Sequence, residues 1–321
     1  MPGRVVYFNG RYVSENEARV SIFDSALMFG DMAFEMTRTF NGKSFKLREH
    51  LERLYGSLRL MEIDAGMTID EMEQLTEETL AQNQPTEAAD VDWQIMHNVS
   101  RGVLGLYTSA IPEGDAPTVS INCWPLITHM GSFAPNYDSG VNLVIPAQQT
   151  LPAHLVDPKA KTRSRLHYQM ANLQAARIGN GWPVLLDPDG FLAEGTGNNI
   201  FLVKNGVIYT PEPRNILLGV SRGVTIELAR KIGIEVHETN LGRYEGLQAD
   251  EIIVTASTFS LVHAVSFEGQ TIGDGKPGPV FQRLMEAWQQ EAGVDFVSQA
   301  KDYAERLPGW LETERTTLQT V

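Results

Sequence analysis

The chain has 321 residues, of which 42% are hydrophobic, so it is long enough for one large domain or two modest ones with real cores. Its 40 acidic and 26 basic residues give a formal net charge of −14. A surface this acidic repels phosphates, which argues against nucleic acid as a partner and favours a small-molecule substrate.

Several other classes of protein are disfavoured by what the sequence lacks. Cys123 is the only cysteine and lies in a strand-like stretch, so we expect a buried, inert thiol and no intramolecular disulfide. No Cys and His cluster has metal-ligand spacing, so we predict no structural zinc. The N-terminus has no apolar signal-peptide core, and no apolar run reaches the ~18 residues of a membrane span. We therefore expect a cytoplasmic protein that does not bind a membrane.

The first part of the chain is predicted to alternate strands and helices. Two-residue turns at Asn9-Gly10 and Asn41-Gly42 predict two hairpins. Thr68 with Glu71 forms a capping box, which predicts the start of a helix. The expected strands are 5–8, 11–13, 34–40, 43–46, 92–99 and 118–124, and the expected helices are 47–64 and 68–83. We predict a small N-terminal domain over 1–125.

An interdomain linker is predicted over 126–140, because this stretch is rich in glycine, proline and other turn-forming residues. A larger domain is expected over 141–321, with 297–321 as a charged surface extension. Its expected strands are 141–146, 184–186, 200–203, 207–209 and 252–255, and its expected helices are 162–179, 221–232 and 281–291.

The most informative local feature is the stretch Glu194 to Asn199, E-G-T-G-N-N, which follows Lys161 by 33 residues and enters an apolar strand. A fixed carboxylate after an upstream lysine is what an enzyme that uses pyridoxal phosphate (PLP) requires. The lysine forms the Schiff base to the cofactor, and the carboxylate keeps the pyridinium nitrogen protonated, so that the ring can act as an electron sink.

Other motifs extend this pattern along residues 5 to 290, and together they resemble the class IV (fold type IV) PLP-dependent aminotransferases. That family includes branched-chain aminotransferases, D-amino-acid transaminases, (R)-selective amine transaminases and aminodeoxychorismate lyases. The motifs are Phe34-Glu35-Met36-Thr37-Arg38, His50-Leu51-Glu52-Arg53-Leu54, Lys161 to Tyr168, Leu217 to Arg222 and Gly273 to Pro279.

The resemblance implies an α+β, two-domain fold. A small N-terminal α/β domain would precede a larger, β-barrel-like C-terminal domain with helices that binds PLP. It also implies a homodimer in which a loop of the partner closes each active site.

The resemblance also assigns roles to single residues. Lys161 becomes the Schiff-base lysine, with Lys159 two positions away as the other choice, and Glu194 the partner of the ring nitrogen. Arg53 becomes the phosphate arginine. Asn199 is expected either to contact the cofactor or only to orient Glu194. Further cofactor contacts are implied for Leu217, Val220, Ser221, Ser257 and Thr258, whereas Arg222 is expected to hold structure.

The substrate is less well defined by the sequence. Strand alternation places Phe34, Met36 and Arg38 on one face, with Arg38 predicted to bind a substrate carboxylate or, alternatively, to pair with Glu35 or Glu49. Gln94 is implied at a pocket position where branched-chain enzymes use arginine. The Arg-x-His carboxylate trap of D-amino-acid transaminases and the basic trap of the lyases are absent.

Residues near the lysine also depart from the branched-chain pattern, which has a tyrosine five residues after the lysine. That position is Leu166 here and Tyr168 comes seven after, so a cofactor contact for Tyr168 is left open. Arg163 and Arg165 have no counterpart in the general family pattern.

The function expected from these features is a ping-pong transamination between an apolar amine or amino acid and a 2-oxo acid such as pyruvate. The lysine-to-glutamate register and Pro183 favour an (R)-selective amine transaminase. The alternatives are a branched-chain or D-amino-acid aminotransferase, and a PLP lyase of the aminodeoxychorismate type.

Overall fold

The structure, a computed structural model, describes residues 3–111, 116–179 and 181–319. The chain divides into two compact units. Unit 1 comprises Met1–Gly131, Ala160–Arg165 and Ala304–Val321, and unit 2 comprises Ser132–Lys159 and Leu166–Tyr303. The predicted division into a small domain over 1–125, a linker over 126–140 and a larger domain over 141–321 stays a prediction. Packing assigns two later segments, 160–165 and 304–321, to unit 1.

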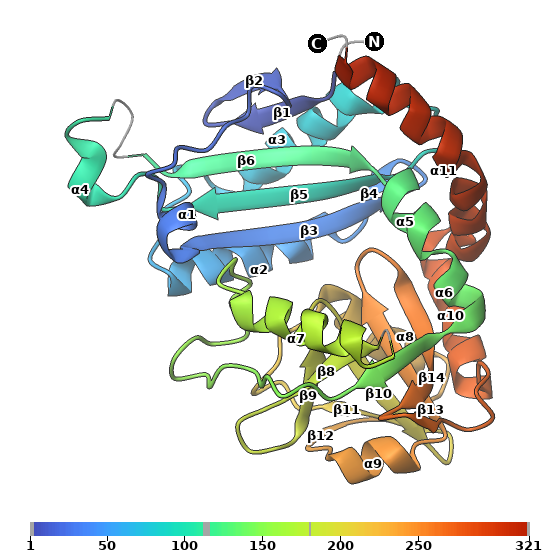
Figure 1. Cartoon of the computed structure of the whole chain (residues 1–321). Helices are drawn as coiled ribbons and strands as arrows, with labels where there is room; N and C mark the ends of the chain where they lie inside the picture. Colours follow the sequence, from blue (N-terminus) through green and yellow to red (C-terminus); the bar gives the residue numbers. More distant parts are fainter. Residues whose placement is uncertain (1–2, 112–115, 180, 320–321) are drawn as a thin grey trace. The chain divides into compact units, whose positions relative to one another are not determined.

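Unit 1 is built on a six-stranded antiparallel sheet with the order β2-β1-β6-β5-β3-β4 (Figure 1). Both predicted hairpins are present, and Asn9 and Asn41 at their turns adopt positive φ angles of 47° and 52°. The strands are β1 (Val5–Phe8), β2 (Arg11–Ser14), β3 (Met32–Phe40), β4 (Lys43–Ser44), β5 (Trp93–Ser100) and β6 (Thr118–Pro125).

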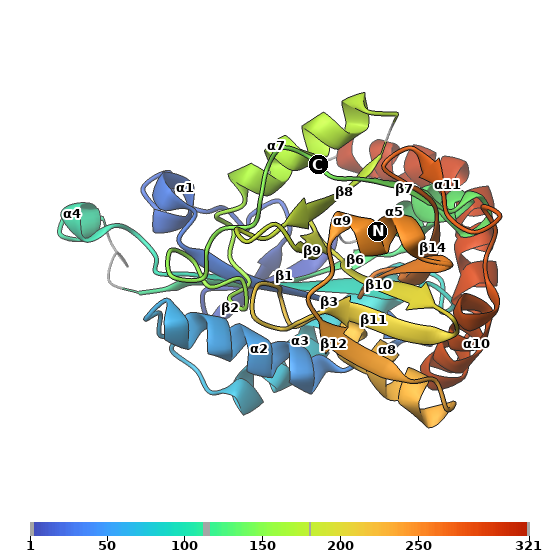
Figure 2. The same cartoon turned by 90° about the horizontal axis from the view of Figure 1, so that it is seen from below.

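Helices α2 (Leu47–Leu60) and α3 (Ile69–Asn83) cover one face of this sheet, as Figures 1 and 2 both show. The core forms there because alternate strand residues such as Ala33, Ile95 and Ile121 meet the apolar stripe of the helices. The capping box predicted at Thr68 and Glu71 is present. Cys123 lies in the same core, so the predicted burial of its thiol is confirmed, and that burial raises the pKa of the thiol to about 12.

The segment 160–165 joins unit 1 by adding to the edge of β3. Phe34 N donates to Lys161 O at 3.0 Å, and Arg163 N donates to Met32 O at 2.9 Å. An isolated bridge pairs Ala33 with Thr162. Backbone pairing with β3 therefore fixes the position of Lys161 in this unit.

Unit 2 contains a curled, nine-stranded mixed sheet with the order β12-β11-β10-β13-β14-β7-β8-β9, and β15 pairs with β14. The β11–β12, β7–β14 and β7–β8 pairs are parallel, and the others are antiparallel. The strands are β7 (Val141–Val144), β8 (Trp182–Leu186), β9 (Leu192–Gly195), β10 (Asn199–Lys204), β11 (Val207–Pro211), β12 (Val236–Thr239), β13 (Glu251–Ala256), β14 (Ser260–Phe267) and β15 (Gln270–Thr271).

The predicted helices of unit 2 are present, with shifted ends. They are α7 (Leu166–Arg177), α8 (Val220–Lys231) and α10 (Pro279–Ala292), and the short α9 (Arg243–Gln248) is not predicted by the sequence. Buried Glu251 fixes the start of α10 by accepting from Val280 N at 2.9 Å and Phe281 N at 2.8 Å. In unit 1, the short helices α1 (Ser25–Phe29) and α4 (Gly105–Thr108) are also absent from the prediction.

Most of the stretch 126–140, predicted as the interdomain linker, is helical. It contains α5 (Ile127–Phe133) and α6 (Pro135–Ser139), with Pro135 in the first turn of α6 and Gly140 at its end with a φ of 64°. Proline and glycine mark the ends of short helices here, as they do in many proteins.

The segment predicted as a surface extension over 297–321 contains helix α11 (Phe296–Gln319), which the sequence does not predict. Phe296, Ala300 and Tyr303 bury one side of its first half, and Trp310 donates to Glu87 in the second. Pro308 interrupts the apolar pattern, which hides the helix from periodicity. Among the described residues, no helix has the length and apolar character to cross a membrane.

Candidate active site

The backbone of Lys161 is held by hydrogen bonds at both its N–H and its carbonyl group. Its backbone N donates to Ser57 Oγ at 3.0 Å, and its backbone O accepts from Phe34 N at 3.0 Å. Its Nζ lies 4.7 Å from the centroid of the Phe34 ring. By contrast, Lys159 belongs to unit 2, where its Nζ contacts Asp157 Oδ1 at 3.4 Å. The structure therefore gives Lys161 a defined position beside an aromatic ring.

Arg53 is held by a buried carboxylate from β3. Its Nε and Nη2 donate to the two oxygens of Glu35 at 2.6 and 2.8 Å, and Glu35 is fully buried. His50 Nδ1 lies 2.8 Å from Glu35 Oε2. This bidentate pair uses two of the five N–H groups of the guanidinium and sets its plane.

Electrostatics keep Glu35 ionised in this setting. Burial alone would raise the pKa of its carboxyl, but Arg53 and His50 outweigh burial and hold that pKa well below its usual range. Burial lowers the pKa of His50 despite its contact with Glu35. The pair therefore behaves as a charged Arg53–Glu35 unit supported by a neutral imidazole.

Glu194, on β9 in unit 2, is the centre of a second hydrogen-bonded group. Its Oε1 accepts from Tyr168 Oη at 3.0 Å, and its Oε2 accepts from Asn199 Nδ2 at 3.1 Å and from Leu217 N at 3.0 Å. These three donors are neutral, and each stabilises an ionised Glu194 by hydrogen bonding to it. A buried anion prepared in this way suits a cationic partner such as a protonated ring nitrogen.

The start of α8 lies against this group. Asn199 Nδ2 also donates to Leu217 O at 3.1 Å, and a Cβ added at Gly219 would clash with Asn199 Oδ1. Gly219 is the N-cap and no side chain caps the helix. The N–H groups of Val220 and Ser221 therefore open an anion site of the kind that helix N-termini provide.

Two further predicted cofactor residues lie in the turn between β13 and β14. Thr258 is buried and Ser257 is partly buried in that turn. Arg222 donates to Pro211 O at 3.0 Å and to Glu238 Oε2 at 2.8 Å, so it holds structure, as the sequence predicts. The predicted cofactor residues of unit 2 thus lie on three features: the Glu194 group, the start of α8, and the turn between β13 and β14.

The predicted substrate residues share one face of the unit 1 sheet, opposite α2 and α3. Strand pairing puts Met36 beside Met96 and Arg38 beside Gln94. Phe34 is buried beneath the side chains of 160–165, Met36 is partly exposed, and Gln94 Oε1 lies 2.9 Å from His129 Nδ1. The shared face predicted for Phe34, Met36 and Arg38 is therefore present.

Arg38 itself is 1% exposed and engaged by the protein. Its Nε donates to Thr39 O at 3.0 Å, its Nη2 lies 3.8 Å from Asp92 Oδ2, and its guanidinium lies over the Phe40 ring. Asp92 also accepts from Gly42 N in the β3–β4 turn. The acid that pairs with Arg38 is thus neither Glu35 nor Glu49, and the carboxylate role of Arg38 stays a prediction.

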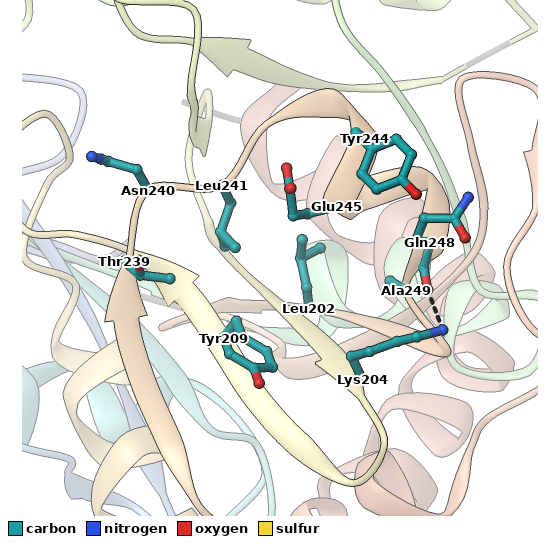
Figure 3. A pocket seen from close by; sticks show the side chains of 10 residues that line it. All are labelled: Leu202, Lys204, Tyr209, Thr239, Asn240, Leu241, Tyr244, Glu245, Gln248 and Ala249. Carbon is teal, nitrogen blue, oxygen red and sulfur yellow. Dashed lines mark hydrogen bonds between the residues drawn. The ribbon is translucent and has the colours of Figure 1, made fainter.

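A pocket of about 290 Å³ in unit 2 holds none of the predicted site residues (Figure 3). It lies between β10, β11 and α9. The amine of Lys204 at its edge donates to Gln248 O and to Asp250 Oδ1, both at 2.7 Å. Lys204 is thus engaged by a carbonyl and a carboxylate, and because none of the predicted cofactor residues lines this pocket, we do not infer the cofactor site there.

Comparisons with known proteins agree with the family and the fold that the sequence predicts. The model of the class IV amino-transferases matches residues 32–267. A Methanocaldococcus jannaschii protein, provisionally named a branched-chain-amino-acid aminotransferase, is 35% identical over 285 residues, covering 88% of this chain and 95% of its own length. The Escherichia coli branched-chain-amino-acid aminotransferase is 28% identical over 289 residues, covering 88% and 91%.

Solved structures agree with this result. The E. coli branched-chain aminotransferase superposes with a TM-score of 0.81 at 27% identity, covering 90% of this chain and 94% of that one. The T.th. branched-chain aminotransferase solved with pyridoxamine 5'-phosphate gives 0.81 at 26% identity, covering 91% and 95%. That relative carries a form of the cofactor predicted from the sequence, so the cofactor prediction is confirmed at the level of the family.

The chain therefore belongs to the class IV aminotransferases, and it is an enzyme with their α+β fold of one smaller antiparallel sheet and one larger curled sheet.

For some residues of the candidate site, the sequence alone does not predict the contacts they make. The sequence leaves the role of Tyr168 open, and the structure shows that it contacts Glu194. The motifs containing Glu35 and His50 are recognisable, but not their hold on Arg53. The signal in the sequence is the presence of acidic and histidine residues in the motifs around Arg53, the predicted phosphate arginine.

Proposed function

We propose that this chain is a PLP-dependent aminotransferase that moves the amino group of a branched-chain or similar apolar L-amino acid to a 2-oxo acid. The observation that carries the proposal is the 35% identity over nearly the full length of both chains to a relative provisionally named for that activity. The names of the E. coli relative and of the solved structures support it. These names favour the branched-chain alternative over the (R)-amine transaminase that the lysine-to-glutamate register suggests.

The residues present fit the cofactor. Glu194 provides a buried anion for the ring nitrogen, whereas Arg53 and the N–H groups of Val220 and Ser221 provide cationic and hydrogen-bonding donors for the phosphate. Ser257 and Thr258 add hydroxyl groups, and Leu217 supplies apolar contact to the ring. When bound, PLP supplies an electron sink for the carbanion that forms at the substrate Cα.

In this proposal Lys161 has two tasks. Its Nζ attaches the resting cofactor covalently, and after release it takes the proton from the substrate Cα and returns one later in the cycle. The hydrogen bonds of its backbone to Phe34 and Ser57 hold its Cα in place, so that the amine moves only by rotation of the side chain. Tyr168 and Asn199 orient Glu194, which keeps a proton on the ring nitrogen.

The branched side chain of the substrate would pack against the apolar part of the sheet face formed by β3 and β5. Phe34 and Met36 supply that surface, and Gln94 adds a polar group at its far end. We include Arg38 in this substrate set as the sequence predicts, although its burial and its pairing with Asp92 weigh against a direct contact.

Product analysis tests the proposal. With L-leucine as donor and 2-oxoglutarate as acceptor, we expect 4-methyl-2-oxopentanoate and glutamate in equal amounts, with parallel-line ping-pong kinetics. Release of pyruvate from an amino donor without any acceptor would instead identify a lyase.

Replacing Arg53 tests the phosphate site. Arg53→Ala should raise the dissociation constant of PLP by roughly one to two decades, because a charge-assisted phosphate contact is lost. It should also lower the unfolding free energy of the apoprotein by ~3 kcal/mol, since Glu35 is left buried without its arginine. Equilibrium dialysis and denaturant unfolding of the apoprotein measure the two effects separately.

The double variant Glu35→Gln/Arg53→Met is the matched control for that experiment. It removes both charges together, so it should recover most of the stability while PLP binding stays weak. PLP affinity at the wild-type level in Arg53→Ala would show that Arg53 only neutralises Glu35.

We also propose a homodimer. An exposed apolar patch at one edge of unit 1 supports it, since such patches mark protein interfaces. The Phe23 and Tyr107 rings lie 4.7 Å apart and bring its two parts together. The exposed members are Ile22, Leu27, Met28, Phe29 and Leu106. Light scattering should find two chains per particle, and a monomer that retains full activity would refute the dimer.

A further inference from the structure

Three cationic side chains of the segment 160–165 surround the ring of Phe34. Lys161 Nζ lies 4.7 Å, Arg163 Cζ 3.8 Å and Arg165 Cζ 5.4 Å from the ring centroid. The ring attracts each cation, but the three positive charges repel one another. A cluster of this kind next to the cofactor lysine suits an anionic ligand.

Arg163 is the member with a built orientation. Its Nη2 donates to Asn98 Oδ1 at 2.8 Å and contacts Met96 Sδ at 3.0 Å. Asn98 is itself oriented, because its Nδ2 donates to Ser120 Oγ at 3.2 Å. Phe34 of β3 therefore stacks on the face of the guanidinium, and Asn98 and Met96 of β5 hold its Nη2.

The ion pairs of the described residues leave Arg163 without an acidic partner. No carboxylate oxygen of the described residues lies within ion-pair distance of it, whereas Arg38 pairs with Asp92 and Arg53 with Glu35. Partial burial, followed by the charge of Arg165, lowers the pKa of Arg163, yet a guanidinium stays protonated in proteins. Within the described part of the chain, Arg163 is thus a cation on the predicted substrate face with no carboxylate beside it, and an anionic ligand would supply that charge.

We propose that Arg163 is the residue that binds the substrate carboxylate, in the amino-acid donor and in the 2-oxo acid acceptor alike. This inference rests on the proposed function and names the carboxylate anchor of that site. Among the described residues, the hydrogen-bonding contacts of Arg163 use its Nη2, so the N–H groups of Nε and Nη1 are left for a carboxylate oxygen beside the positive charge. Lys161 and Arg163 both contact the Phe34 ring, so the reacting amine and the proposed carboxylate anchor lie close together in unit 1.

The proposal also accounts for two departures from the family pattern. The chain lacks the Arg-x-His trap after Gly102, and Gln94 stands where branched-chain enzymes are expected to have arginine. A guanidinium two residues after the lysine supplies the missing positive charge from another segment of the chain.

Equilibrium binding to the holoenzyme tests the role of Arg163. Calorimetric titration should show that wild type binds 4-methylvalerate more tightly than the neutral 4-methylvaleramide. Arg163→Gln should weaken binding of the acid roughly 10- to 100-fold and leave the amide unchanged. Arg163→Lys should recover part of the preference for the acid over the amide, because lysine keeps the charge but lacks the fixed N–H donors of the guanidinium.

Two more variants separate recognition from damage. Asn98→Asp should pair with Arg163 and weaken acid binding as Arg163→Gln does, although Arg163 itself is intact. Arg11→Gln, at an exposed arginine of β2, should behave as wild type. PLP retention should be unchanged in Arg163→Gln, which distinguishes a carboxylate anchor from a phosphate contact.

The proposal is overturned if wild type binds acid and amide equally or binds neither, if Arg163→Gln retains the preference, or if it loses PLP instead. It is also overturned if Arg38→Met, and not Arg163→Gln, removes the preference for the acid. Failure of the proposed function looks different, since wild type would then bind the acid through Arg163 and yet transfer no amino group from any L-amino acid.

Discussion

Lys161→Ala is expected to abolish transamination while PLP still binds noncovalently. A methyl group can neither attach the cofactor nor move the proton at the substrate Cα, so both tasks of Lys161 are lost together. The backbone contacts of residue 161 with Phe34 and Ser57 do not involve the side chain, so the fold should survive. The measurements are steady-state turnover and the mass of the protein after borohydride reduction.

Lys159→Ala is the matched control for this experiment. Lys159 contacts Asp157 and Arg214 O at its exposed position, and its loss should leave turnover and the reducible adduct intact. If Lys159→Ala loses both while Lys161→Ala keeps them, the lysine has been assigned in the wrong register.

The second large effect is expected for Glu194→Gln, which should slow proton abstraction by about two orders of magnitude or more. Glutamine keeps the shape of the side chain but carries no charge, so the ring nitrogen loses its proton and the electron sink weakens. One of the donors at Tyr168, Asn199 and Leu217 would also face an amide NH₂, which costs about 1–3 kcal/mol.

Single-turnover absorbance changes with an amino donor measure this rate directly. Tyr168→Phe is the graded control, because it removes one of the three hydrogen bonds and leaves the charge. Its effect should be much smaller than that of Glu194→Gln. A near-normal rate in the glutamine variant would reduce Glu194 to a structural residue of the β9 turn.

Local chemistry explains which parts of the fold are predictable. The Asn-Gly hairpins and the Thr68 capping box are encoded within a few residues, so each appears where expected. Helix α11 escapes prediction because Pro308 breaks its pattern and its second half packs through polar contacts such as Trp310 with Glu87. Strand β14 escapes it too, since a continuous buried stretch has no alternation to reveal it.

The site shows the same division. Lys161, Glu194 and Arg53 can be chosen because motifs mark them, but their partners depend on tertiary contacts. Arg38 meets Asp92, which directly precedes β5, and no pattern along the chain links the two. The general family pattern does not explain Arg163, and only the structure shows its contact with Asn98.

The measurement that tests the account most directly is the half-reaction of the holoenzyme with single donors, followed by the visible absorbance of the bound cofactor. L-leucine, L-isoleucine and L-valine should each remove that absorbance in a saturable manner, while D-leucine and (R)-1-phenylethylamine should do so far more slowly. Rapid conversion by (R)-1-phenylethylamine or by D-leucine, with the L-amino acids inert, would contradict the branched-chain assignment. It would place the enzyme among the amine or D-amino-acid transaminases of the same family.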